Sequence, residues 1–332
     1  MNDRVPTIES TPSARRTRAL FALVCTCALW SLSFPTMKTL GLHIARLEPN
    51  VSTWFVAAAT LVVRFGVSAL VLALFGVPRP QRKELVQGAI LGLFTGLGML
   101  FQMDALSFTS ASTSAFLTQG YIVILPVFAA ISARALPSPK IALCVLTIAS
   151  GLAVLSGFDW AHLRLGRGEA ETLLAALCFA FQIGCLDHRA FSVNRTRVVS
   201  CLMFLGVALV LAPVAAVTAH GAADAKLLFA TPVAAALVFL LCVPSTTIAF
   251  SLMNRFQPDV SASEAGIIYG AEPVFASLLA LFLPGIYATF ANVSYDNERL
   301  TQRLLIGGGL VIVANVLLQI PLGKRERAAS KS

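Results

Sequence analysis

The chain has 332 residues, of which 57% are hydrophobic and only 12% are charged, and its formal net charge is +9. An average soluble domain is about 25% charged, so this composition excludes an ordinary soluble enzyme, a disordered chain and a coiled coil. The charges stand in short clusters between long apolar runs, which is typical of a polytopic helical membrane protein. Orientation in a lipid bilayer therefore explains the excess positive charge, and we expect no nucleic-acid partner.

In chain order, the apolar runs predict an all-α polytopic membrane protein with ten transmembrane helices, because each span needs about 20 mostly apolar residues. The approximate bounds of the runs are 19–40, 51–76, 85–104, 110–135, 140–157, 169–190, 198–219, 231–253, 261–284 and 300–321. Residues 1–18 form a polar tail and residues 322–332 a basic tail. Most lysines and arginines of the predicted loops and tails lie on the side of the termini, so we expect both termini in the cytoplasm. The compact design suits a bacterial inner membrane.

A short motif in the fourth predicted span recurs in the ninth. Residues 126–129 and 273–276 both read Pro-Val-Phe-Ala, and a Ser-Ala-Ser precedes each copy, at 110–112 and 261–263. The copies predict two repeats of five helices each. Because five is odd, the second repeat enters the membrane in the opposite sense, and inverted repeats are a device of secondary transporters. A duplicated channel or a membrane scaffold is the alternative.

The repeat divides the chain into two domains. The first repeat covers 19–157, a polar linker covers 158–167, and the second repeat covers 168–321. Two pseudo-symmetric halves supply inward-open and outward-open states of similar energy. We therefore expect alternating access about a site near the middle of the membrane.

Four motifs occur in order along the chain: the stretch from Ala28 to Lys38, the Arg64-Phe65 pair, and the helices around 109–126 and 261–276. In these motifs the chain resembles the EamA-type domain of the drug/metabolite transporter superfamily. The resemblance implies export or exchange of small metabolites such as amino acids, or of drug-like compounds. The chain departs from the family pattern at Ser31, where glycine is usual, and by an insertion at 286–297. The insertion shapes an external gate or is a tolerated surface loop whose polar end is solvated.

Two ionisable residues stand near the centres of predicted spans, Arg64 in the second and Glu272 in the ninth. A central charge costs about 2.5–3.5 kcal/mol on insertion scales, so each needs a partner or a watery cavity. One hypothesis is that both face a cavity between the halves, where Glu272 binds a proton or a cationic group and Arg64 a carboxylate. The alternative is that each is a structural tie, paired with the other or with helix ends.

Five further residues complete the candidate substrate site. Gln119 and Gln182 are amides in mid-membrane that suit amino-acid-like ligands or join helices, and Trp30, Tyr121 and Tyr269 line an aromatic cavity or pack in the core.

Two other motifs in the second half have local interpretations. Glu264 fits a helix cap behind Ser261 better than a functional role. Pro244, followed by Ser-Thr-Thr, predicts a bend whose freed backbone groups bind hydroxyls or line the path.

The sequence favours a secondary transporter over other classes. It holds no Walker motif, no H-E-x-x-H and no G-x-S-x-G, so we expect neither an enzyme nor a metal or cofactor site. The expected partners are a small-molecule substrate, the lipid bilayer and, through Glu272, protons. An exchanger of phosphorylated metabolites or nucleotide sugars is the second candidate, but such anions need several cavity cations and only Arg64 is central.

Overall fold

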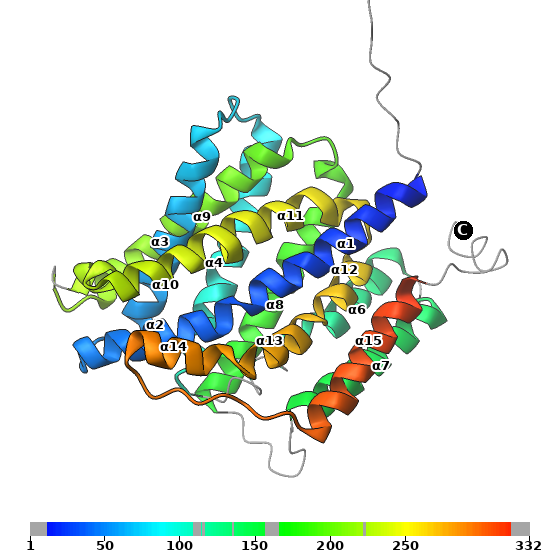
Figure 1. Cartoon of the computed structure of the whole chain (residues 1–332). Coiled ribbons are helices and arrows are strands. Elements are labelled where there is room, and N and C mark those ends of the chain that lie inside the picture. The colour runs from blue at the N-terminus through cyan, green and yellow to red at the C-terminus, as the bar shows by residue number, and fades with distance from the viewer. Residues whose placement is uncertain are drawn as a thin grey trace, which may run out of the picture.

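The computed structural model describes residues 12–108, 114, 117–134, 136–156, 166–221 and 224–319, which form helices joined by short connections, with no strand among them (Figure 1). The α-helices are α1 (Pro12–Ser31), α2 (Ser33–Leu47), α3 (Thr53–Leu74), α4 (Arg82–Ala105), α6 (Tyr121–Ala133), α7 (Pro139–Ser156), α8 (Arg167–Asp187), α9 (Thr196–Thr218), α10 (Pro232–Cys242), α11 (Ala249–Phe256), α12 (Ala262–Tyr269), α13 (Glu272–Ala280), α14 (Leu283–Ala291) and α15 (Gln302–Gln319). A π-helix, η4 (Val243–Ile248), joins α10 to α11, and the short 3-10 helices are η2 (Arg189–Phe191), η3 (Asp224–Phe229) and η5 (Gln257–Asp259).

The all-helical class predicted from the sequence is confirmed, and several helices are suited to a membrane. Six are long and apolar enough to cross one, and a seventh span results if Ala262–Ala280 and Leu283–Ala291, bent by 59°, count together. Three shorter apolar helices cover Tyr121–Ser132, Pro139–Val154 and Leu305–Leu317. The count of ten spans and the two-repeat division stay predictions. The predicted tails and linker fall largely on 1–11, 157–165 and 320–332, outside the described residues.

The first predicted span, 19–40, is extended at both ends in the structure. Helix α1 already begins at Pro12, within the predicted tail, because its basic first turns have acidic partners far along the chain. Arg15 Nη2 lies 2.8 Å from Asp259 Oδ1, and Arg16 Nη2 lies 2.9 Å from Glu264 Oε1. Between α1 and α2 the helix is interrupted at Leu32, since Pro35 has no N–H to donate to the carbonyl of Ser31.

The ninth predicted span is broken twice. Helix α12 ends at Tyr269 and α13 begins at Glu272, because Pro273 cannot donate to the carbonyl of Tyr269. The second break turns the chain into α14, which packs on α2: the hydroxyls of Tyr287 and Thr36 lie 3.2 Å apart. Its position beside α2 is visible in Figure 1.

The insertion at 286–297 therefore contains most of α14 and an irregular segment. Arg46 Nη1 donates to the carbonyl of Asn292 at 2.6 Å, and Lys38 Nζ lies 4.9 Å from the ring centre of Tyr295. Burial, and then the charge of Glu298, raise the pKa of Tyr295 to about 12. Most of the polar residues from Asn292 to Asn297 are exposed, as expected of a solvated end.

Glycines allow a close contact of α4 with α9. A Cβ added at Gly88 would lie 2.4 Å from the Cβ of Leu202, and one at Gly92 would lie 2.8 Å from the Cα of Gly206. No side chain fits between the two backbones at Gly92, so the glycine spacing of α4 is required by close packing. This contact joins a helix of the first half to one of the second.

Candidate functional site

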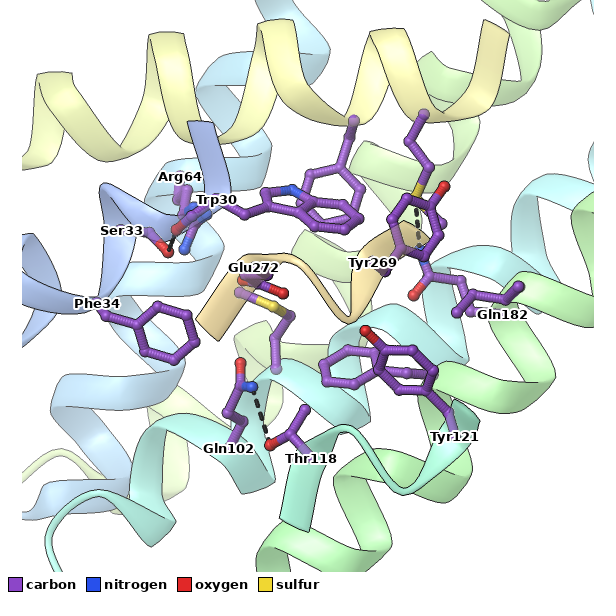
Figure 2. Close-up of a pocket in the computed structure, with 15 residues that line it drawn as sticks. Trp30, Ser33, Phe34, Arg64, Gln102, Thr118, Tyr121, Gln182, Tyr269 and Glu272 are labelled. Carbon is purple, nitrogen blue, oxygen red and sulfur yellow. Dashed lines mark hydrogen bonds between the residues drawn. The ribbon is translucent and has the colours of Figure 1, made fainter. Parts of the chain in front are cut away.

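A cavity lies in the middle of the bundle, between helices from both halves of the chain (Figure 2). It encloses about 510 Å³ of empty space, part of it open to the surroundings. The lining residues are Trp30, Ser33, Phe34, Arg64, Met99, Gln102, Thr118, Tyr121, Phe179, Gln182, Ile183, Phe250, Met253, Tyr269 and Glu272. Thr118 precedes α6, and the others come from α1 to α4, α6, α8 and α11 to α13, so the cavity exists only where the two halves meet.

Arg64 lies at the cavity wall, but protein groups occupy its guanidinium. The side chain is 1% exposed, and its Nε donates to the hydroxyl of Thr246. Its Nη2 donates to the carbonyl of Ser245 at 3.1 Å, and its Nη1 lies 3.6 Å from Met37 Sδ. Arg64 therefore ties α3 to η4, as the structural alternative predicted, and also places a positive charge at the cavity.

The local sequence explains why η4 can accept this arginine. Pro244 disturbs the α-helical ladder, and the N–H of Ala249 bonds the carbonyl of Pro244 instead of that of Ser245. The freed carbonyl of Ser245 is the one that accepts from Arg64. The predicted bend at Pro244 is thus present, and its free backbone group has a charged partner.

Glu272 stands at the first turn of α13 with its carboxylate in the cavity. Its backbone carbonyl accepts a 2.8 Å hydrogen bond from the Ser31 hydroxyl, which fixes α13 against α1. Its side chain has the Gln119 amide as a hydrogen-bonding neighbour. Among the described ion pairs, none joins Glu272 to Arg64, so a direct pairing of the two charges is wrong. Figure 2 shows Glu272 between Trp30 and Gln102.

Aromatic side chains cover one wall of the cavity. The ring centre of Trp30 lies 5.1 Å from that of Phe250 and 5.3 Å from that of Tyr269. Tyr269 is held by its hydroxyl, which donates to Gln257 Oε1 at 3.0 Å. The indole N–H of Trp30 is buried and has no acceptor among the described residues. The wall can stack against an apolar or aromatic ligand, and the indole N–H is an unused donor there.

The two predicted amides occupy different positions. Gln182 lines the cavity and directs its amide to Met253 Sδ at 3.7 Å. Gln119 is outside the lining, 4% exposed, and its side chain neighbours both Glu272 and Tyr121. The structure therefore brings six of the seven sequence candidates to one cavity and places the seventh behind two of them.

The sequence did not single out the other nine lining residues. Gln102 carried a usable signal, since an amide in an apolar helix needs a partner, and its Nε2 donates to the Thr118 hydroxyl at 3.2 Å. The apolar residues Met99, Phe179 and Ile183 carried none, because a cavity-facing and a core-facing apolar residue look alike in a sequence.

Glu264 has the structural role expected for it. The Ser261 hydroxyl accepts from the Glu264 N–H at 3.2 Å, and Glu264 Oε2 accepts from the Ser261 N–H at 3.0 Å. This reciprocal pair is a capping box at the start of α12. The second carboxylate oxygen accepts from Arg16, so Glu264 also fastens α1.

Comparison with known proteins gives three matches. Residues 17–157 match the EamA-like transporter family. An uncharacterized transporter of Archaeoglobus fulgidus is 23% identical over 306 residues, which cover 92% of this chain and 87% of that protein. A solved crystal structure shares the fold with a TM-score of 0.65 and 18% identity, covering 96% of this chain and all of that one.

Proposed function

We propose that the whole chain is a secondary transporter that moves small metabolites or drug-like compounds by alternating access, as the match of residues 17–157 to the EamA-like transporter family suggests. The observation that carries this proposal is the cavity lined by both halves, with Glu272 facing into it. A carrier needs its site where two rigid bodies meet, because rocking one body against the other then exposes the site to each side in turn.

The pattern of helix contacts supports the inverted repeat. In the proposed ten-span arrangement, each span of the first half corresponds to the span five places later in the second half. If every span is replaced by its counterpart, the contact of α4 with α8 becomes the contact of α1 with α11. The same exchange turns the contact of α4 with α9 into that of α3 with α10, and it leaves α3–α9 and α7–α15 unchanged. All of these contacts exist. The seven longer spans and the three shorter apolar helices would make up the ten.

The charges of the cavity favour a zwitterionic or cationic substrate. Glu272 offers a carboxylate and the aromatic wall offers ring faces, both of which attract an ammonium group. Arg64 is the one cation among the described lining residues, and protein groups occupy it. A phosphate group needs several donors, so phosphorylated substrates fit this cavity poorly.

We propose that substrate transport is coupled to the exchange of protons. We also propose that the protein lies in a bacterial inner membrane with both termini in the cytoplasm. One proton gains roughly 2.3 kcal/mol per 100 mV, so a potential of about 150 mV supports a substrate gradient of a few hundred-fold. Glu272 would take the proton when the substrate leaves. Glu272 is the one carboxylic acid among the described residues that line the cavity, so it is the group there that we propose as the proton carrier.

The test is counterflow of radiolabelled compounds in proteoliposomes, with a panel of amino acids and cationic drugs, with and without a pH gradient. We expect accumulation above equilibrium only with the gradient, and we expect Glu272→Gln to abolish that accumulation while exchange at equal pH persists. Glu264→Gln is the matched control, because Glu264 lies outside the cavity and a glutamine at this position can still form the capping box. Unchanged pH dependence in Glu272→Gln would refute the proton role, and absence of saturable exchange would refute transport of these compounds.

A further inference from the structure

A second group of charged residues lies away from the cavity, where α4 ends and α8 begins. Arg167 Nη2 donates to Asp104 Oδ2 at 2.5 Å, and Arg167 Nε donates to Glu171 Oε1 at 2.7 Å. One guanidinium therefore serves two carboxyl groups. With both carboxyl groups ionised the cluster would carry one uncompensated negative charge.

The carboxyl groups are buried and incompletely bonded. Asp104 is 1% exposed and Glu171 8% exposed. The remaining oxygen of each, Asp104 Oδ1 and Glu171 Oε2, is buried without a donor among the described residues. The two carboxyl groups also lie within hydrogen-bonding reach of each other. Two buried carboxyl groups this close together repel unless a hydrogen lies between them.

Among the residues that the structure describes, no second cation lies where it could neutralise the pair. The Arg167 guanidinium lies 4.0 Å from the ring centre of Phe108 and 5.8 Å from that of Trp54, both apolar neighbours. Glu169 turns its carboxylate to the N–H of Gly166 at 2.9 Å.

The other described charges on helices packed against α4 and α8 lie near the middle or at the opposite end of the bundle. They are Arg64 on α3, Arg189 on η2, Arg197 on α9, Asp259 on η5 and Glu264 on α12. Helix α6, which also packs on α8, has no charged residue between its ends.

We propose that Asp104 and Glu171 hold one proton between them and form a proton-binding site, separate from the cavity, that fastens α4 to α8. With the proton bound, one carboxyl donates to the other carboxylate, and Arg167 balances the remaining charge. Release of the proton to the solvent, which reaches the half-exposed Arg167, leaves two adjacent carboxylates whose repulsion loosens the contact. Proton binding here does not depend on what the protein transports, whereas any effect on transport rests on the proposed function.

Infrared difference spectroscopy of the purified full-length protein tests the shared proton. The measurement uses the Glu272→Gln variant, so that the cavity carboxyl gives no signal. We expect a band of a protonated carboxyl group that disappears as the pH rises and is lost in Asp104→Asn and in Glu171→Gln. Isotope-labelled aspartate and glutamate locate the same band without substitution at the pair, which keeps the test valid if those variants misfold. Glu84→Gln, which alters a fully bonded carboxylate, should leave the band unchanged.

Thermal unfolding gives an independent reading. Loss of the shared proton leaves two adjacent carboxylates that repel, so the midpoint of unfolding should fall by several degrees as the pH rises from about 5 to about 9. At least half of that fall should vanish in Asp104→Asn and Glu171→Gln. The absence of any band from these residues would overturn the proposal and indicate two ionised carboxylates. Identical pH profiles of the wild type and both variants would overturn it as well.

The effect on transport is tested separately. If exchange occurs in the wild type, Glu171→Gln, which imitates the protonated state, should slow it several-fold at high pH while the infrared result stands. A failure of exchange in the wild type would count against the proposed function and leave the proton site intact.

Discussion

The two ends of α4 hold the same kinds of group and differ in how completely those groups are bonded. At the first turn, Glu84 accepts from the N–H, Nε and Nη2 of Arg195 at 2.7–3.0 Å and from the N–H of Gln81 at 2.7 Å. At the last turn, Asp104 shares Arg167 with Glu171, and one oxygen of each carboxyl has no donor among the described residues.

The difference separates a structural tie from a titratable one. A carboxylate with four donors is stable as an anion and loses little by staying one at any physiological pH. Two carboxyl groups with one arginine have a charge that depends on a proton, since a partly satisfied buried network is costly. The role of a buried acidic residue therefore depends on how many hydrogen-bond donors its carboxylate has. The number of buried acidic residues alone does not show which of them titrate.

The largest effect should come from disturbing the contact of α4 with α9 at Gly92, near the middle of α4. Gly92→Ala places a Cβ 2.8 Å from the Cα of Gly206, where only backbone could yield. We expect a loss of about 1–3 kcal/mol in unfolding free energy, measured by thermal unfolding in detergent. The control is Gly309→Ala, whose Cβ would meet nothing within 4 Å. Equal midpoints for the two variants would show that α4 is not held closely to α9.

A smaller effect on the unfolding midpoint should distinguish the first turn of α4 from its last turn. Glu84→Gln removes the anion from four donors and should lower the unfolding midpoint by several degrees at every pH. Asp104→Asn replaces an oxygen by a donor that can serve Glu171, so at low pH it should lower the midpoint by less than half as much. The measurement is a pair of unfolding curves at low pH. A larger loss in Asp104→Asn than in Glu84→Gln would reverse the comparison.

The smallest effect concerns pH at the start of α4. The hydrogen bonds that Arg195 donates to Glu84 raise the pKa of Arg195 above its ordinary value. A raised pKa means that this stabilisation is complete below the ordinary value and is lost only as the pH rises through the folded one. Arg195→Lys should therefore shift the midpoint by an amount that stays constant from about pH 5 to about pH 9. A shift that varies within this range would show that the first turn also titrates.

Local features of the fold followed from short stretches of sequence. The capping box of Ser261 and Glu264, the bend at Pro244 and the break at Pro273 each depend on groups within about one helical turn, so residue types and spacing suffice. The close contact at Gly88 and Gly92 was also predictable, because glycines four residues apart form one smooth face. The EamA resemblance of the first half rested on motifs of the same local kind.

Other features exceeded what such patterns contain. The early start of α1 depends on acidic partners more than two hundred residues away. The bend before α14 was missed, because a long apolar run does not show where a helix stops inside a bundle.

By itself, the sequence determined that the chain is helical, apolar and built for a membrane, because composition and local spacing control hydration and backbone hydrogen bonding. It also identified Arg64 and Glu272 as charged residues that are costly to bury. Only the tertiary structure decided what they meet: Arg64 binds Ser245 and Thr246, and Glu272 faces an open cavity. Only the structure showed that Asp104 lies against Glu171, a pair that the sequence analysis had not singled out. These outcomes depend on the register and crossing of packed helices, to which distant residues contribute together and which no short stretch specifies.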